Sequence, residues 1–195
     1  MYSSEFVACS MAGMSGLNDD LLAFQRGYTP VGTYYAYAYL EKRDTKERHV
    51  LIMITGRNEN DNRPVADISL QSCPEIASAK FITNNELSPV LHYATANNIY
   101  RVTYDISTNT ANPDATPSWT APAGEEITLM RMTNDAGIDI TDSPANKVLF
   151  VATWNGSEGK VYYLNVNLTS GEISAEPIEV FGGFGKIYDL KFKRQ

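Results

Sequence analysis

The chain has 195 residues, of which 43% are apolar and 20% charged, with 16 lysines and arginines against 23 aspartates and glutamates. That apolar share is sufficient for a packed core, and the length predicts one domain or a piece of a larger one. A net charge of −7 leaves no basic surface for a phosphate backbone, which argues against nucleic-acid binding. No apolar run reaches the ~18–20 residues of a membrane span.

The first 30 residues are expected to form a strand and a short helix ahead of the main domain. Phe6–Ser10 has the composition of a strand. Asn18–Phe24 predicts a helix with Asn18 as its N-cap and Gly27 as its stop. The segment lacks the basic start and the apolar run of ~7–15 residues that a signal peptide needs. The chain as written is therefore expected in the cytoplasm, unless an exporting segment precedes it.

The two cysteines, Cys9 and Cys73, lie far apart and belong to no CxxC pair. We expect buried thiols that behave as small apolar residues. A disulfide between them stays open only if the protein is exported, because the cytoplasm keeps thiols reduced.

The rest of the chain contains an internal repeat. Each unit begins with a strand centred on an alanine, and the three alanines are evenly spaced at Ala36, Ala94 and Ala152. A second strand follows in each unit, over 49–54, 99–104 and 161–166. A third is expected over 64–70 and 177–181, with a shorter stretch around Trp119 in the second unit. Each unit closes with a cation and a large apolar residue, at Lys80-Phe81, Arg131-Met132 and Lys191-Phe192.

These strands predict an all-β fold. About four short antiparallel strands per unit are typical of β-propeller blades, which stack face to face. We therefore expect a propeller-like domain over 31–195, with three four-stranded, blade-like repeats at about 31–84, 85–133 and 145–195. A β-sandwich is the alternative, because the alternation of apolar residues alone does not separate the two folds. Propellers close with ~4–8 blades, so we expect a partial propeller that is a fragment of a longer chain.

Motifs for catalysis are scarce. His49 and His92 fall in different predicted strands, where a structural role is the default. There is no HExxH, GxSxG or phosphate-binding loop, so neither zinc nor nucleophilic chemistry has support. Carboxylate chemistry stays open, since glycosidases need only two facing acids. The candidates are the adjacent pairs Asp19-Asp20 and Glu125-Glu126, whose side chains are expected to point apart or face water.

Two loops are rich in oxygen ligands. One covers Asn58–Asn62, and the other offers Asp135, Asp139 and Asp142. Calcium takes ~6–8 oxygen ligands from loops of this kind, but neither loop has EF-hand spacing. Solvated turns are therefore the favoured interpretation, and no cofactor is expected.

Aromatic residues give the only ligand-binding candidates. Trp154 ends a predicted strand at a loop mouth, beside Asn155, and Trp119 lies in a proline-flanked segment. An exposed ring at such a position can stack on a sugar or anchor a peptide, while the neighbouring amide donates hydrogen bonds. Packing between repeats is the alternative for both tryptophans.

The amino-acid sequence of the repeat resembles that of a known family. The segments Tyr93–Asp105, Lys147–Gly156 and Val180–Phe192 are similar to the C-terminal half of PKD-like family lipoproteins of gut and oral Bacteroidota, over roughly residues 30–195. Those proteins are often encoded beside outer-membrane nutrient-uptake proteins of the SusC/SusD type. The resemblance implies an exported, lipid-anchored protein of the cell surface or periplasm, without known enzymatic chemistry. The chain departs from the family because it lacks the signal, the lipidated cysteine and the PKD-like N-terminal domains.

Together these features predict a non-catalytic binding module that recognises a glycan or a protein partner, in association with outer-membrane uptake proteins. Two other functions stay open. One is a propeller glycosidase or lyase that uses Asp and Glu, and the other is a purely structural scaffold.

Overall fold

The structure is a computed structural model that describes residues 19–28, 34–55, 63–84, 90–132, 146–167 and 169–190. These residues form thirteen β-strands and one short 3-10 helix, Ile76–Ser78, with no α-helix among them. No helix in this part of the chain is long and apolar enough to cross a membrane.

The strands form three antiparallel sheets. The N-terminal sheet pairs β1 (Asp19–Tyr28), β2 (Tyr34–Lys42), β3 (Arg48–Thr55) and β4 (Arg63–Ser69) in chain order. The middle sheet pairs β5 (Phe81–Asn84), β6 (Val90–Ala94), β7 (Asn98–Asp105) and β8 (Thr110–Pro113), with β9 (Trp119–Thr120) beside β7. The C-terminal sheet pairs β10 (Glu126–Met132), β11 (Asn146–Trp154), β12 (Gly159–Asn167) and β13 (Glu179–Phe184). The expected all-β fold of three four-stranded, blade-like repeats is confirmed.

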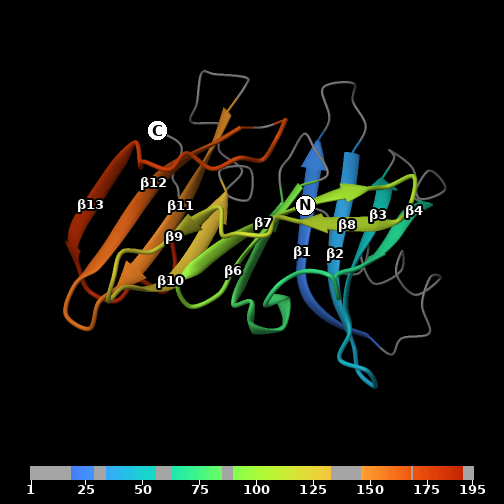
Figure 1. The fold of residues 1–195 in the computed structure, drawn as a ribbon, viewed down its shortest axis with the longest axis horizontal. Coiled ribbons are helices and arrows are strands. Elements are labelled where there is room, and N and C mark those ends of the chain that lie inside the picture. The colour runs from blue at the N-terminus through green and yellow to red at the C-terminus, as the bar shows by residue number, and fades with distance from the viewer. Residues whose placement is uncertain are drawn as a thin grey trace.

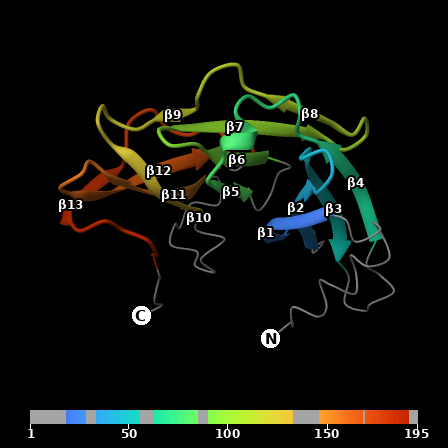
Figure 2. The ribbon, with the colours of Figure 1, turned by 90° about the horizontal axis from the view of Figure 1, so that it is seen from below.

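The sheets lie along an open arc with the middle sheet at its centre (Figures 1 and 2). The first strand of each sheet lies on the concave side of the arc, where β5 contacts both β1 and β10. The later strands of each sheet run outward, as in the blades of a propeller.

Alternation along the strands sends large apolar residues to the two gaps between sheets. The first gap is filled mainly by aromatic and branched side chains: Tyr37, Tyr39, Val50, Ile52 and Ile68 from the N-terminal sheet, and Leu91, Tyr93, Tyr100, Val102 and Tyr104 from the middle sheet. The second gap holds Ala94, Ile99 and Trp119 from the middle sheet, with Met130, Leu149, Val151, Tyr162, Leu164 and Val166 from the C-terminal sheet. The middle sheet is thus packed on both faces.

The helix expected over Asn18–Phe24 is wrong for the residues that the structure describes. Asp19 begins β1, which pairs with β2 along its whole length, from Asp19 opposite Lys42 to Tyr28 opposite Tyr34. Pairing with a neighbouring strand outweighs a local capping signal, because it satisfies the backbone hydrogen bonds of the whole segment. The expected strand at Phe6–Ser10 lies outside the described residues.

The sheets also divide the chain differently from the expected repeats. Lys80-Phe81 and Arg131-Met132, expected to close their units, lie at β5 and β10, each the inner strand of the next sheet. The alanines are equivalent in the middle and C-terminal sheets. Ala94 points into the second gap and Ala152 points to the outer face of the C-terminal sheet, so both side chains point the same way along the arc. Ala36 instead lies on the outer face of the N-terminal sheet, opposite in direction to Tyr37. A one-residue offset in a strand reverses the face, which the alanine spacing does not reveal.

Candidate functional site

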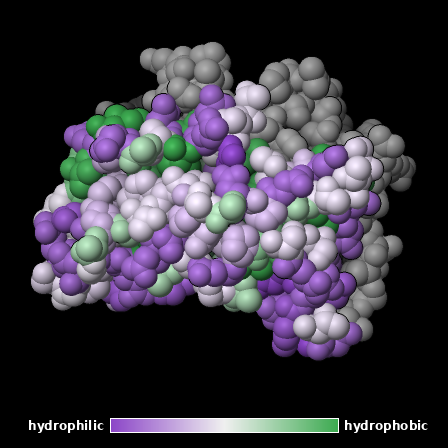
Figure 3. Space-filling view, in the orientation of Figure 1, coloured by the Kyte–Doolittle hydropathy of each residue, from purple (hydrophilic) through white to green (hydrophobic). Residues whose placement is uncertain are grey.

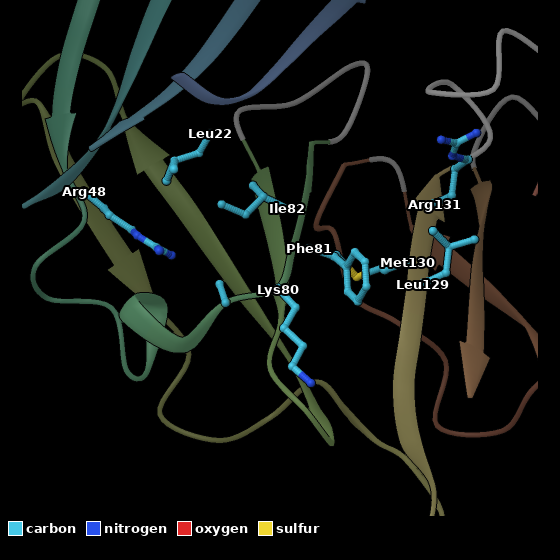
Figure 4. Close-up of a pocket in the computed structure, with 9 residues that line it drawn as sticks. Leu22, Arg48, Lys80, Phe81, Ile82, Leu129, Met130 and Arg131 are labelled. Atoms are coloured by element: carbon cyan, nitrogen blue, oxygen red, sulfur yellow. The ribbon is translucent and has the colours of Figure 1, made fainter. Parts of the chain in front are cut away.

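A cleft of about 340 Å³ opens on the concave side, where the inner strands approach one another. Five of the described residues that line it are large and apolar: Leu22, Phe81, Ile82, Leu129 and Met130. The others are Ala79 and three cations, Arg48, Lys80 and Arg131. Figure 4 shows Arg48 and Leu22 on one side of β5 and the β10 residues on the other, with Phe81 beside Met130.

The strands explain how these side chains meet. Phe81 lies opposite Ala94 of β6, and the backbone N–H of Lys80 donates to the Ala94 carbonyl, which fixes the start of β5. A register shift in β10 between Ile127 and Leu129 sends Leu129 to the outer face of the C-terminal sheet, while Met130 packs in the second gap. The cleft therefore draws on three sheets at once.

The three cations are each held by a neighbour. Arg48 is largely buried; it donates through Nε to Glu41 at 3.2 Å and through Nη1 to the Ile76 carbonyl at 2.5 Å. Lys80 donates to Glu126, and this hydrogen bond lowers the pKa of the Glu126 carboxyl. These contacts orient the two side chains without using all their donors, since an ammonium has three and a guanidinium five.

Arg131 reaches the chain beyond β13. Its Nη1 donates to the Leu190 carbonyl at 2.8 Å and lies 3.6 Å from Oδ1 of Asp189. The two ion pairs Lys80–Glu126 and Arg131–Asp189 are arranged alike. In each, a cation at an inner strand pairs with a carboxylate of the next segment along the arc.

The predicted aromatic candidates lie away from the described lining of this cleft. Trp119 is only 8% exposed, and its ring centroid lies 5.3 Å from that of Tyr162 in the second gap. It therefore packs between repeats, which was the alternative to ligand binding. Trp154 is half-buried at the end of β11. Asn155 uses its side-chain oxygen to accept the backbone N–H groups of Ser157 and Glu158, so it holds the β11–β12 turn.

The predicted calcium ligands, Asp135, Asp139 and Asp142, and the loop Asn58–Asn62 lie outside the described residues, as does Cys9. Cys73 is a buried free thiol, and burial raises its pKa to about 11. Among the residues that the structure describes, no group of histidine, cysteine or acidic side chains has the arrangement of a metal site.

In each adjacent acid pair, the two carboxylates bind different partners. Glu125 is buried and accepts hydrogen bonds from Lys160, Thr153 and Tyr162 at 2.6–2.8 Å. Burial opposes its ionisation, but these donors outweigh it and lower the pKa of Glu125. Asp19 contacts His49, and Asp20 accepts from Arg43 at 2.7 Å. Each of these carboxylates therefore has a structural partner.

Comparisons with protein-family models, with curated proteins and with solved structures found no match. The sequence had marked Lys80, Phe81 and Arg131 as parts of a repeated pattern, without assigning them a site. Leu22 and Arg48 carried no signal, because only the packing of the N-terminal sheet against β5 brings them to the cleft.

Proposed function

We propose that this protein is a non-catalytic binding module whose concave cleft holds an extended segment of a partner protein. The segment presents apolar side chains to the apolar residues of the lining and acidic side chains to its cations. The observation that carries this proposal is the composition of the described lining, which combines five large apolar side chains with three cations.

The apolar lining favours a protein segment over a glycan. Leu22, Ile82, Leu129 and Met130 offer no polar atoms to sugar hydroxyls, but they match aliphatic or aromatic side chains. Methionine adapts its shape to different neighbours, which is useful in a peptide groove. Glycan recognition would instead use an open aromatic ring, but Trp119 is packed inside the fold, and the aromatic ring of the lining, Phe81, packs against two hydrophobic clusters.

The cations favour acidic partners. The protein as a whole carries a net charge of −7, and the lining gathers three cations, each paired with a carboxylate that is not among the lining residues. Lys80 and Arg131 are both partly exposed and have donors left over for an incoming carboxylate. Charge complementarity of this kind sets partner choice and association rate more than affinity.

A displayed library of random peptides tests the proposal. The wild-type protein is expected to select peptides that alternate apolar and acidic residues, and the double variant Lys80→Gln/Arg131→Gln is expected to lose that selection. Lys42→Gln is the matched control, because Lys42 pairs with Glu47 and is not among the lining residues. Selection of the same peptides by the double variant, or binding to a glycan array alone, would refute the peptide cleft.

We further propose that the module acts at the bacterial cell surface or in the periplasm, beside outer-membrane uptake proteins. The support is the resemblance of residues 30–195 to PKD-like lipoproteins. Protease treatment of cells that express the full gene product checks this: a surface protein is digested in intact cells, a periplasmic one only after the outer membrane is permeabilised, and a cytoplasmic one in neither case.

A further inference from the structure

The chain beyond β13 turns back over the C-terminal sheet and reaches the cleft. Figure 2 shows it leaving the outer strand and returning toward the concave side of the arc. Ile187 and Leu190 pack against the hydrophobic cluster on the outer face of this sheet, and that cluster includes the lining residue Leu129. Arg131, a second lining residue, binds the same stretch of chain. We call residues 186–190 the return segment.

The return segment has the chemistry that the cleft is proposed to recognise. Its sequence is Lys-Ile-Tyr-Asp-Leu, in which an acid lies between aliphatic residues. Ile187 and Leu190 are half-buried, and the carboxylate of Asp189 lies 3.6 Å from the Arg131 guanidinium. The same guanidinium donates to the Leu190 carbonyl at 2.8 Å. Arg131 therefore reads a carboxylate and a backbone carbonyl of an extended segment, as it would in a bound partner.

The return segment is held more loosely than the strands before it. The pairing of β13 with β12 ends where Phe184 lies opposite Gly159, so residues 186–190 lie outside the strand ladder. Lys186, Tyr188 and Asp189 are exposed. A segment with few buried side chains and no place in a sheet opens at a low cost in free energy. It can therefore leave the cleft while the three sheets stay folded.

Apolar surface at this end of the molecule also remains uncovered. Seven large hydrophobic side chains are exposed among the described residues, and five of these lie within residues 178–188: Ile178, Val180, Phe181, Phe184 and Tyr188. Figure 3 shows hydrophobic residues gathered at the upper left, over the C-terminal sheet. The return segment thus covers its surroundings incompletely, and exposed apolar surface of this kind usually marks an interaction site.

We propose that the return segment is an internal competitor for the cleft, which binds Arg131 as a partner would and must be displaced before a partner binds there. The inference rests on the proposed function and names the partner's pattern at this end. That pattern is an aliphatic residue, any residue, an acid and an aliphatic residue, as in Ile187 to Leu190. A short tether gives the segment an effective concentration of about millimolar, so weak peptides are excluded.

Binding of a labelled peptide Lys-Ile-Tyr-Asp-Leu with blocked ends to the whole chain tests the proposal. Asp189→Lys sets a cation against Arg131 and is expected to release the segment. A segment that covers the site nine-tenths of the time lowers the apparent affinity about tenfold, so we expect a gain of about that size in the variant. Equal affinity of the wild type and Asp189→Lys for the peptide would overturn the proposal.

Two further variants test where the peptide binds. Tyr188→Ser is the matched control, because Tyr188 belongs to the same segment but its ring lies beside Lys186, and it is expected to keep the wild-type affinity. Both Tyr188 and Asp189 are exposed, so folding is retained. Arg131→Gln, added to Asp189→Lys, is expected to remove the tenfold gain. A gain in Tyr188→Ser, or a gain that survives Arg131→Gln, would refute the role of the Arg131 contact.

Selection from the random peptide library on the Asp189→Lys variant separates this inference from the proposed function. We expect peptides with the aliphatic–any–acid–aliphatic pattern to be enriched more strongly than on the wild type. Equal enrichment of apolar and acidic peptides by both chains would refute the internal competitor and leave the peptide cleft standing. If neither chain selects any peptide, the proposed function fails, and the inference fails with it.

Discussion

Nε2 of His92 lies 2.7 Å from the carbonyl oxygen of Gly171, and this contact fastens the loop after β12 to the middle sheet. The neighbouring Arg101 strengthens the same junction, since it donates to the Ser170 carbonyl at 2.7 Å and forms a two-pronged pair with Asp114. His92 is completely buried, and its Nδ1 has no hydrogen-bond partner among the residues that the structure describes. The imidazole therefore holds the junction as a neutral ring that donates from Nε2.

Acid is expected to weaken the fold through His92. Burial lowers its pKa to about 4 from an ordinary value of 6.5. Below pH 6.5 the His92 ring binds a proton in the unfolded chain, whereas in the folded chain it stays neutral down to about pH 4. The free energy of unfolding therefore falls as the pH drops from about 6.5 to 4. The shift corresponds to about 3 kcal/mol. Denaturant unfolding across this range checks it, with His92→Gln as the variant that lacks this slope; an unchanged slope in the variant would assign the effect elsewhere.

His49 is expected to act in the opposite direction. Its Nδ1 lies 2.6 Å from Asp67 and its Nε2 3.1 Å from Asp19, and the hydrogen bond to Asp67 is the main reason its pKa is raised. The stabilisation is complete below pH 6.5 and is lost as the pH rises through the higher folded value. NMR titration of the two histidine rings separates the predictions, because His49 must titrate above 6.5 and His92 below it.

Replacement of Gly171 by alanine tests the loop junction by packing. The residue has a positive φ of 71°, and an added Cβ would overlap Cγ1 of Val90. We expect a loss of about 3 kcal/mol, the sum of backbone strain and steric overlap. Gly124→Ala is the control, because Gly124 has a similar φ of 84° and open space around it. That variant is expected to lose only about 1 kcal/mol, and equal losses would deny any contact between the loop and Val90.

The adjacent acids Glu125 and Glu126 are expected to differ sharply in their contribution to stability. Glu125→Ala strands the buried hydroxyls of Thr153 and Tyr162 and is expected to cost about 3 kcal/mol. Glu126→Ala removes an exposed pair with Lys80 and is expected to change the free energy of unfolding by less than about 1 kcal/mol. Thermal and denaturant unfolding measure both; a costly Glu126→Ala would show that the exposed pair holds the inner strands together.

Residue patterns in the sequence were sufficient for the central hairpins and for the outer strand β4, but not for the inner strand β1. Apolar runs centred on Ala36, Ala94 and Ala152 identified the second strand of each sheet, because a strand buried on both faces is apolar almost continuously. The inner strand β1 was missed, since Asn18 and Gly27 resemble helix boundaries and only pairing with β2 decides the outcome. The cleft was missed for a related reason. Leu22 and Arg48 belong to one sheet and Met130 to another, so no local pattern joins them.

The position of the middle sheet predicts the order in which the molecule opens. β6 and β7 are covered by aromatic and aliphatic side chains from both neighbours, whereas β13 has solvent on its outer edge. In stacked repeats each unit is stabilised mainly by adjacent units, so the ends fray first. Backbone amides of Leu91–Ala94 should consequently exchange with deuterium only during global unfolding, long after those of the peripheral strands.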